Sequence, residues 1–275
     1  MNFVKMHGIG NDYVYVNCFE ESVDDPAALA RRVSDRHTGV GSDGLVLILP
    51  SDTADLRMRM FNSDGSEAEM CGNAIRCVGK LAYERGLCDT LSPRVETLAG
   101  VRRLRLYAQN RCVERVAVDM GTPEWRPAHI PVDARGESFL ARPMEVDGKI
   151  WTVTCVSMGN PHAVIFTDGI DDLDLPRIGP LFERHPMFPK RINTEFVEVE
   201  SDAALRMRVW ERGAGETMAC GTGACAAAVA GARNGLSGRN TRVRLRGGDL
   251  HIEWRDDDHV LMTGEAVAVF EGRLL

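Results

Sequence analysis

Two cysteines stand in matching contexts far apart in this 275-residue chain. Cys71 and Cys220 are each followed by a glycine and then by an apolar pattern of helical period, in Cys71-Gly72-Asn73-Ala74 and Cys220-Gly221-Thr222-Gly223. Free backbone N–H groups at the start of a helix attract anions, and the same field lowers the pKa of a nearby thiol. We therefore expect a thiol of raised acidity beside an anion-binding backbone in each half of the chain.

The two cysteines belong to a longer internal repeat. A constant offset of 149 residues (220 − 71), with no gap, aligns Arg57–Phe61 with Arg206–Trp210, Glu67 with Glu216, and Gly10-Asn11 with Gly159-Asn160. A duplicated pair of domains usually packs about a pseudo-twofold axis, and a cleft between domains is a favoured ligand site. We expect Cys71 and Cys220 to flank one bound molecule from opposite sides.

A facing pair of thiols suits the inversion of a stereocentre. Inversion needs a base on one face of the carbon and an acid on the other, and two like groups can exchange these roles in the reverse direction. Two helix starts directed at one carboxylate would also stabilise the charge that develops when its α-proton leaves. A single Cys-Gly pair could be no more than a tight turn around a packed cysteine. Two such pairs at one offset instead predict an amino-acid racemase or epimerase.

The polar residues around the repeat differ between the halves. The offset aligns Asn62 with Glu211, Ser63 with Arg212 and Gly44 with Asn193, whereas Asn11 and Asn160 match. Arg212 can bind a distal carboxylate through two N–H groups, and Asn62, Asn193 and Glu211 can bind an ammonium group. This asymmetry predicts a substrate with a second amino-acid head group, although asparagines are also common in ordinary turns.

The elements that would position these residues follow the same order in both halves, judged from the period of their apolar residues. In the first half we expect a helix after Asp25, a helix from Cys71 to Gly86, and strands over residues 3–6, 13–16, 45–49, 56–61, 101–106 and 113–118. In the second half we expect helices over residues 176–185 and 220–233, and strands over residues 150–156, 163–166, 194–199, 205–210, 241–245, 250–254, 259–263 and 266–270.

The second long helix, rich in alanine from Ala224 to Ala232, is small and apolar on all sides and should be buried on all sides. We expect an α/β fold of the α+β type, with two homologous domains related by pseudo-twofold symmetry. Each would be a curved, mostly antiparallel sheet wrapped around a central helix. The predicted domains are residues 1–120 and 121–263, and the sequence leaves open whether residues 264–275 return to the first.

Composition narrows the class of protein. Apolar residues make up 44% of the chain and charged residues 27%, which is typical of an ordinary soluble globular protein. The net charge of −7 argues against a nucleic-acid-binding protein. No apolar run approaches the roughly 18 residues of a membrane helix, and the first ten residues do not form a secretion signal. The eight cysteines lack metal-site spacing. We expect a cytoplasmic protein without metal, nucleic-acid partner or membrane contact.

Several motifs together resemble the diaminopimelate epimerase family over nearly the whole chain. They are Gly8-Ile9-Gly10-Asn11-Asp12, Gly39-Val40-Gly41-Ser42-Asp43-Gly44, Phe61-Asn62-Ser63-Asp64-Gly65-Ser66, Met70-Cys71-Gly72-Asn73-Ala74, Gly159-Asn160-Pro161-His162, Arg191-Ile192-Asn193-Thr194-Glu195, and Trp210-Glu211-Arg212-Gly213, which leads into Ala219-Cys220-Gly221-Thr222-Gly223. This chain departs from the pattern at Gly44, where some members carry a glutamine.

The resemblance implies interconversion of LL- and meso-diaminopimelate, in lysine and peptidoglycan precursor synthesis, without pyridoxal phosphate or any other cofactor. It implies Cys71 and Cys220 as catalytic acid and base, with His162 and Glu211 as supporting catalytic residues. The residues implied around the substrate are Asn11, Asn62, Gly72, Asn73, Asn160, Asn193, Glu211, Arg212, Gly221 and Thr222. A homodimer is also usual in the family.

Other functions stay open on the sequence. A proline-type racemase would share the two-thiol chemistry, although its substrate has one carboxylate and would not need Glu211 and Arg212. Gly39-x-Gly41-x-x-Gly44 matches a dinucleotide-binding fingerprint, but it precedes a strand and does not link a strand to a helix. A pyridoxal enzyme would need a suitable lysine, a thiol sensor would need a resolving cysteine, and a binding module would show affinity without turnover.

Overall fold

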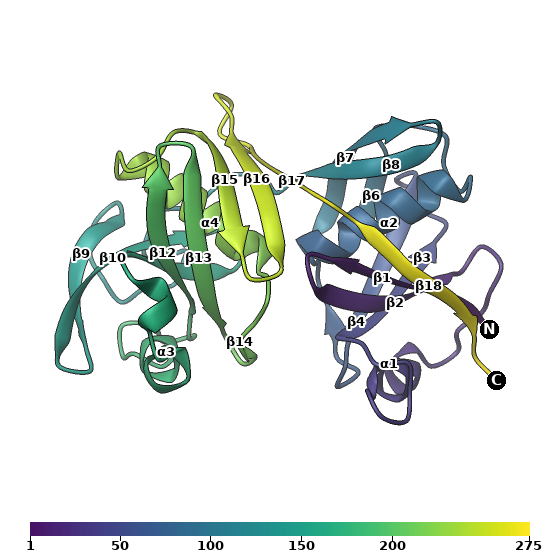
Figure 1. Cartoon of the computed structure of the whole chain (residues 1–275), viewed down its shortest axis with the longest axis horizontal. Coiled ribbons are helices and arrows are strands. Elements are labelled where there is room, and N and C mark those ends of the chain that lie inside the picture. Colours follow the sequence, from purple (N-terminus) through teal and green to yellow (C-terminus); the bar gives the residue numbers. More distant parts are fainter. The chain divides into compact units, whose positions relative to one another are not determined.

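The computed structural model describes residues 1–275, and the chain divides into two compact units. The first unit comprises Met1–Asp119 together with Thr263–Leu275, and the second comprises Met120–Met262. The fold is mixed α/β, mostly strands, with two of its four α-helices in each unit (Figure 1).

The first unit forms its sheet from both ends of the chain. It contains helices α1 (Pro26–Ser34) and α2 (Gly72–Glu84) and strands β1 (Asn2–Gly8), β2 (Asn11–Asn17), β3 (Gly44–Leu49), β4 (Leu56–Asn62), β5 (Glu67–Ala68), β6 (Arg94–Thr97), β7 (Gly100–Gln109), β8 (Cys112–Asp119) and β18 (Val267–Arg273). The strand order is β18-β1-β2-β3-β4-β6-β7-β8, and only β2–β3 and β4–β6 are parallel. In Figure 1, β18 (yellow) lies beside β1 (purple).

The second unit repeats this arrangement. It contains the short 3-10 helix η1 (Ile170–Asp172), helices α3 (Leu175–Glu183) and α4 (Gly221–Arg233), and strands β9 (Phe139–Val146), β10 (Lys149–Ser157), β11 (Pro161–Phe166), β12 (Asn193–Ser201), β13 (Ala204–Glu211), β14 (Gly215–Glu216), β15 (Asn240–Leu245), β16 (Gly248–Trp254) and most of β17 (Val260–Gly264). The order is β9-β10-β11-β12-β13-β15-β16, with β11–β12 and β13–β15 parallel.

The two sheets also agree in register. In the parallel pair β2–β3, Tyr13 lies opposite Gly44, and in β11–β12, His162 lies opposite Asn193. Both pairs are related by the offset of 149 residues (162 − 13 and 193 − 44) found in the sequence. Equal topology and equal register support the interpretation of the repeat as a duplication. The prediction of mostly antiparallel sheets is confirmed.

Each long helix packs against several strands of its own unit. Helix α2 contacts β1, β2, β3, β7 and β8, and α4 contacts β10, β11, β12, β13, β15 and β16. The seven residues from Ala224 to Ala230 of α4 are all buried, as the sequence predicted, because alanine lets strands approach on every side. The shorter helices cover a second core in each unit, in which α1 contributes Leu29 and Val33 and α3 contributes Phe182.

The strands and helices expected from the sequence are all present, with ends displaced by a few residues. Four strands were missed: β5, β6, β9 and β14. Strand β9 was missed because it contains Pro143, which edge strands tolerate. Strand β6 has only four residues, and β5 and β14 have two each, too few for a visible alternation.

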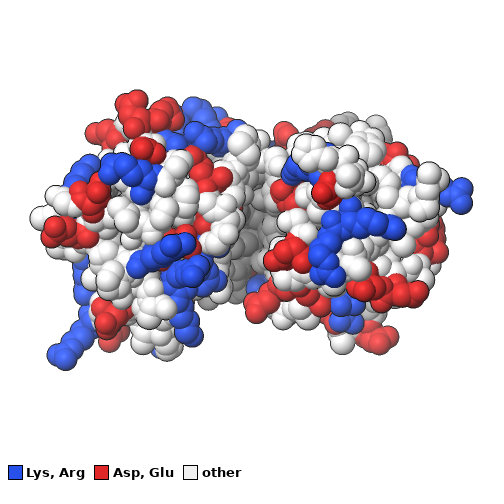
Figure 2. Space-filling model, turned by 90° about the horizontal axis from the view of Figure 1, so that it is seen from below, with Lys and Arg blue, Asp and Glu red and all other residues white.

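Charged side chains of both signs lie on the surface among uncharged residues. On the face drawn in Figure 2, Lys and Arg are interspersed with Asp and Glu. The arginine-rich strand β15 follows the same rule, since Arg244 donates to Glu200 at 2.9 Å and Arg242 lies 3.7 Å from Asp249. No helix combines the length and the apolar character needed to cross a membrane.

Candidate active site

Cys71 occupies the N-cap position of α2. Its backbone is extended (φ −134°, ψ 124°), and the helix begins at Gly72. The Cys71 Sγ donates to Oδ1 of Asn11, at the start of β2, over 3.3 Å, and Nδ2 of Asn73 donates to the same oxygen over 3.5 Å. The first unit therefore brings three of the predicted site residues, Cys71, Asn73 and Asn11, into direct contact.

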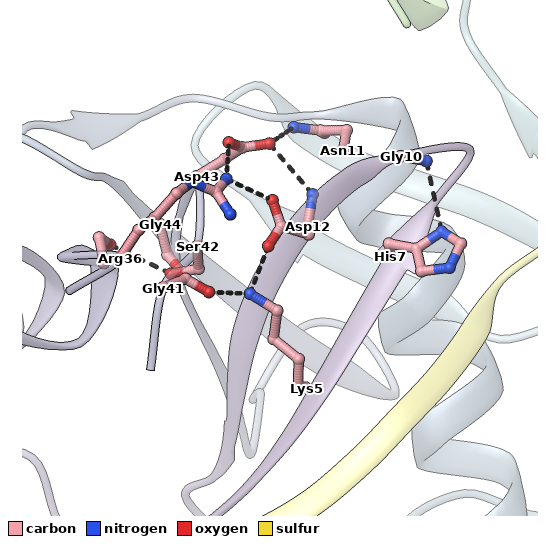
Figure 3. Close-up of polar contacts among 11 residues, drawn as sticks. Lys5, His7, Gly10, Asn11, Asp12, Arg36, Gly41, Ser42, Asp43 and Gly44 are labelled. Atoms are coloured by element: carbon pink, nitrogen blue, oxygen red, sulfur yellow. Dashed lines mark hydrogen bonds and ion pairs between the residues drawn. The ribbon is translucent and has the colours of Figure 1, made fainter. Parts of the chain in front are cut away.

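A charged network lies behind Asn11 (Figure 3). Nδ2 of Asn11 donates to Oδ2 of Asp43 over 2.8 Å, and Arg36 donates to Asp43 over 3.0 Å and to Asp12 over 2.9 Å. Lys5, which is buried, donates to the carboxylate of Asp12. Burial alone would raise the pKa of Asp12, but the hydrogen bonds and charges of Arg36 and Lys5 lower it below its ordinary value.

Cys220 is the N-cap residue of α4, with an equally extended backbone (φ −125°, ψ 110°). Its Sγ accepts from the backbone N–H of Gly223 over 3.4 Å and lies 3.6 Å from Oγ1 of Thr222. Burial, followed by the negative charges of Glu211 and Glu195, raises the pKa of the Cys220 thiol well above its usual value. The expectation of a lowered pKa is wrong for Cys220, because the two hydrogen bonds do not offset desolvation.

His162 and Glu195 form a buried pair in the second unit. Both side chains are fully shielded from solvent, with Nδ1 of His162 2.7 Å from Oε1 of Glu195 and Nε2 of His162 2.9 Å from Oδ1 of Asn160. Burial raises the pKa of Glu195, and the neighbouring His162 partly offsets that effect. A Cβ at Gly223 would lie 2.8 Å from Oε1 of Glu195, so this carboxylate reaches the start of α4 beside Cys220.

Sequence reasoning gave Glu195 and Asp43 no role, although both lie in motifs that carry the family resemblance. Glu195 lies two residues after Asn193 in β12, so the alternation of a strand directs both side chains to one face. Asp43 precedes β3, which runs parallel to β2. Asn11 begins β2 and Asp43 immediately precedes β3, so the parallel pairing of these two strands could have indicated that Asp43 lies beside Asn11.

The remaining polar residues of the second unit meet where β12 begins and β13 ends. Oδ1 of Asn193 accepts from the backbone N–H of Arg212 over 2.9 Å, and Nδ2 of Asn193 donates to the carbonyl of Pro161 over 2.9 Å. The guanidinium of Arg212 donates to the carbonyl of Lys190 over 3.1 Å. Glu211 accepts from the hydroxyl of Thr217. The second unit thus groups the predicted Asn193, Glu211 and Arg212 at one end of the sheet.

Two positions of the first unit behave differently from the cluster around Cys71. Asn62 ends β4 and donates to Oγ of Ser66 over 2.9 Å, inside the turn that follows. A Cβ at Gly44 would lie 2.0 Å from the carbonyl oxygen of Phe61, so the backbone is built closely around glycine there. The motif from Gly39 to Gly44 joins α1 to β3, which is not the strand-to-helix turn of a dinucleotide site.

Comparisons with known proteins agree with the resemblance. The family model described as diaminopimelate epimerase matches residues 3–126 and 154–269. A diaminopimelate epimerase of Acetivibrio thermocellus is 61% identical over 275 residues, which cover 100% of this chain and 98% of the relative. One of Desulfovibrio desulfuricans is 62% identical over 279 residues, which cover 99% of this chain and 97% of the relative.

A solved structure supports the fold. A probable proline racemase from Agrobacterium radiobacter superposes with a TM-score of 0.72 at 15% identity, covering 100% of this chain and 92% of that chain. At that identity the likeness concerns the fold alone, which is a mixed α/β fold like that of proline racemases. The two diaminopimelate epimerases are far more similar to this chain and match it over its full length, so the family assignment rests on them. On those matches and on the family model, the chain belongs to the diaminopimelate epimerase family.

Proposed function

We propose that this member of the diaminopimelate epimerase family is an isomerase that interconverts LL- and meso-2,6-diaminopimelate by proton transfer at one α-carbon, in cytoplasmic lysine and peptidoglycan precursor synthesis. In the proposal, one of Cys71 and Cys220 removes the α-proton as a thiolate, and the other delivers a proton to the opposite face as a thiol. One observation carries the proposal: each half places a cysteine at the N-cap of its long helix, at the common offset.

The proposal requires a particular assembly of the halves. Residues 1–120 with 264–275, and residues 121–263, would be homologous domains related by a pseudo-twofold axis, each a curved sheet wrapped around α2 or α4. Both thiols would then face the same carbon. The shared strand order and register of the two sheets support this symmetry. The proposal also includes a homodimer, which is usual in the family. Proton transfer between two thiols and the substrate needs no cofactor.

The substrate would lie between the two helix starts. Backbone N–H groups at Gly72-Asn73 and Gly221-Thr222 would hold the reacting carboxylate, because both pairs open a helix. The side chains of Asn11, Asn62, Asn160, Asn193, Glu211 and Arg212 would lie around the substrate, with Asn62, Asn193, Glu211 and Arg212 at its distal head group. In this arrangement Arg212 matches the distal carboxylate, which a monocarboxylate such as proline lacks.

Glu211 and His162 would support the reaction through Cys220. Because the charge of Glu211 raises the pKa of Cys220, a substrate ammonium bound to Glu211 would weaken that effect. The thiol would then become easier to ionise when the substrate is in place. His162, held between Glu195 and Asn160, would fix the position of Asn160.

Solvent deuterium tests the proposal. Wild type, Cys71→Ala and Cys220→Ala are incubated with LL- or meso-diaminopimelate in D₂O, with Cys112→Ala, an exposed cysteine, as the matched control. We expect wild type and the control to exchange the α-hydrogen and epimerise, and each of the other variants to lose epimerisation. Wild-type rates in either single variant would refute the two-thiol mechanism. Turnover of proline in place of diaminopimelate would favour a proline-type racemase.

A further inference from the structure

The loop from Gly39 to Gly44 has no part in the reaction described so far, yet it presents Asp43 to Asn11. A carboxylate only accepts hydrogen bonds, so the Asn11 atom 2.8 Å from Oδ2 of Asp43 is the NH₂ group. This removes the ambiguity between oxygen and nitrogen that usually affects amide side chains. The other end of the amide, which faces Cys71 Sγ at 3.3 Å, is therefore the carbonyl oxygen.

We propose that Asp43 is a positioning residue, which orients the amide of Asn11 so that its oxygen accepts the hydrogen bond of the Cys71 thiol. The proposal rests on the proposed catalytic role of Cys71, but it makes its own prediction about the reactivity of that thiol. Asp43 itself would touch neither substrate nor the reacting atoms.

The Asp43 carboxylate is held from several directions (Figure 3). Its Oδ2 also accepts from the backbone N–H of Asp12 over 3.1 Å, and its backbone N–H donates to the carbonyl of Asp12 over 2.7 Å. Arg36 binds the other oxygen over 3.0 Å. Lys5 ties Asp12 to the carbonyl of Gly41, a glycine with φ +80°. The glycine motif and its charges thus fix one carboxylate next to one amide.

The second half supports its matching asparagine in another way. The position equivalent to Asp43 is Ile192, at the offset of 149 residues (192 − 43). There Asn160 contacts Nε2 of His162 through Oδ1 at 2.9 Å, so its orientation depends on the protonation of that ring. The orientation of Asn11 carries no such dependence. The two asparagines are matched in sequence, but only Asn11 is set by a fixed negative charge.

The hydrogen bond from thiol to Asn11 stabilises the protonated form of Cys71 and so lowers the thiolate fraction. A weak hydrogen bond shifts a pKa by about half a unit, which changes the thiolate fraction about threefold. Loss of this bond should therefore raise the rate of alkylation at fixed pH by about threefold. Tyr15 and Cys77 are electrostatically coupled to Cys71, and the substitutions below leave both in place.

Iodoacetamide alkylation at pH 7.5, followed cysteine by cysteine with peptide mass spectrometry, tests the proposal on the whole protein. Asp43→Ala should speed the alkylation of Cys71 about threefold without changing Cys220 or the exposed Cys112. Asp43→Asn removes the same charge but keeps an acceptor oxygen, so it should restore the slow rate. In an Asn11→Ala background, Asp43→Ala should have no further effect.

Three outcomes would overturn the assignment. Equal acceleration at all three cysteines would mean that Asp43→Ala loosens the whole fold. Equal rates in the Ala and Asn variants would mean that charge and not orientation acts on Cys71. A persistent Asp43 effect in the Asn11→Ala background would mean that the two residues act independently. None of these readouts uses turnover, so they stand apart from the fate of the proposed epimerase mechanism.

Discussion

A single methyl group added at Gly223 tests the geometry around Cys220. The Cβ of an alanine there would lie 2.8 Å from Oε1 of Glu195 and 3.2 Å from Sγ of Cys220. Neither neighbour can swing into solvent, because Glu195 is fully buried and Cys220 is 5% exposed. Gly223→Ala should therefore displace the thiol, the carboxylate or both.

Two opposing effects set the change in stability. Alanine is favoured over glycine inside a helix by about 1 kcal/mol. Forcing an extra carbon into a packed core costs about 1–3 kcal/mol. The free energy of unfolding should therefore fall by no more than about 2 kcal/mol. Activity should fall much further, because displacing a reacting group by about 1 Å can cost about a hundredfold in rate.

Gly79→Ala in α2 is the matched control. Its Cβ would meet Cδ1 of Leu104 at 2.7 Å, which is the flexible end of an aliphatic side chain. Urea denaturation and epimerisation rates are measured for both variants. We expect comparable losses of stability, with a loss of about a hundredfold in kcat/KM only for Gly223→Ala. A kcat/KM of Gly223→Ala within about twofold of wild type would contradict this prediction, because the thiol would then tolerate displacement.

Two further predictions concern stability. Arg59–Glu67 and Arg208–Glu216 are equivalent pairs, but the arginine side chains are 32% and 6% exposed. Arg208→Ala should lower the free energy of unfolding by about 3 kcal/mol, because buried acceptors lose their donor. Arg59→Ala should lower it by about 1 kcal/mol or less, because the pair is partly exposed. Equal losses of the two variants in urea denaturation would contradict this expectation. Burial raises the pKa of Cys77 to about 11. An unfolded thiol ionises near 8.5, so stability should fall between pH 9 and 11 by up to ~3 kcal/mol as the unfolded state loses its proton first. Cys77→Ala should make the free energy of unfolding depend less on pH in this range, as measured by urea denaturation at a series of pH values.

Much of the fold could be predicted from the sequence because the signals are local. The run from Ala224 to Ala230 is small and apolar at every position, so it predicts that α4 is buried on all sides, whichever strands cover it. The cysteines could be placed at helix starts because glycine and small residues follow them. The constant offset predicted two homologous halves, and in the structure each half has two parallel strand pairs at matching positions.

The electrostatics of the site could not be predicted in the same way. The field at a helix start is a local property, and it led to the expectation of an acidic thiol at Cys220. Desolvation depends on which residues cover the sulfur, and the charges of Glu195 and Glu211 come from other strands. Tertiary packing therefore decides the direction of the pKa shift. The contact between His162 and Glu195 joins neighbouring strands, and no spacing rule in the sequence indicates it.

The divergence of the two halves follows from the proposed chemistry itself. Inversion at a carbon needs one thiol and one thiolate at the same moment. Two identical environments would favour the same protonation state in both cysteines and leave the difference to the substrate alone. Both copies retain the cysteine and the asparagine, but Asp43 supports Asn11 where Ile192 stands in the other half. His162 and Glu195 in turn stand where the first half has Tyr13 and Val46. The surroundings of the thiols therefore differ, while the matching thiols can still exchange the roles of acid and base in the reverse direction.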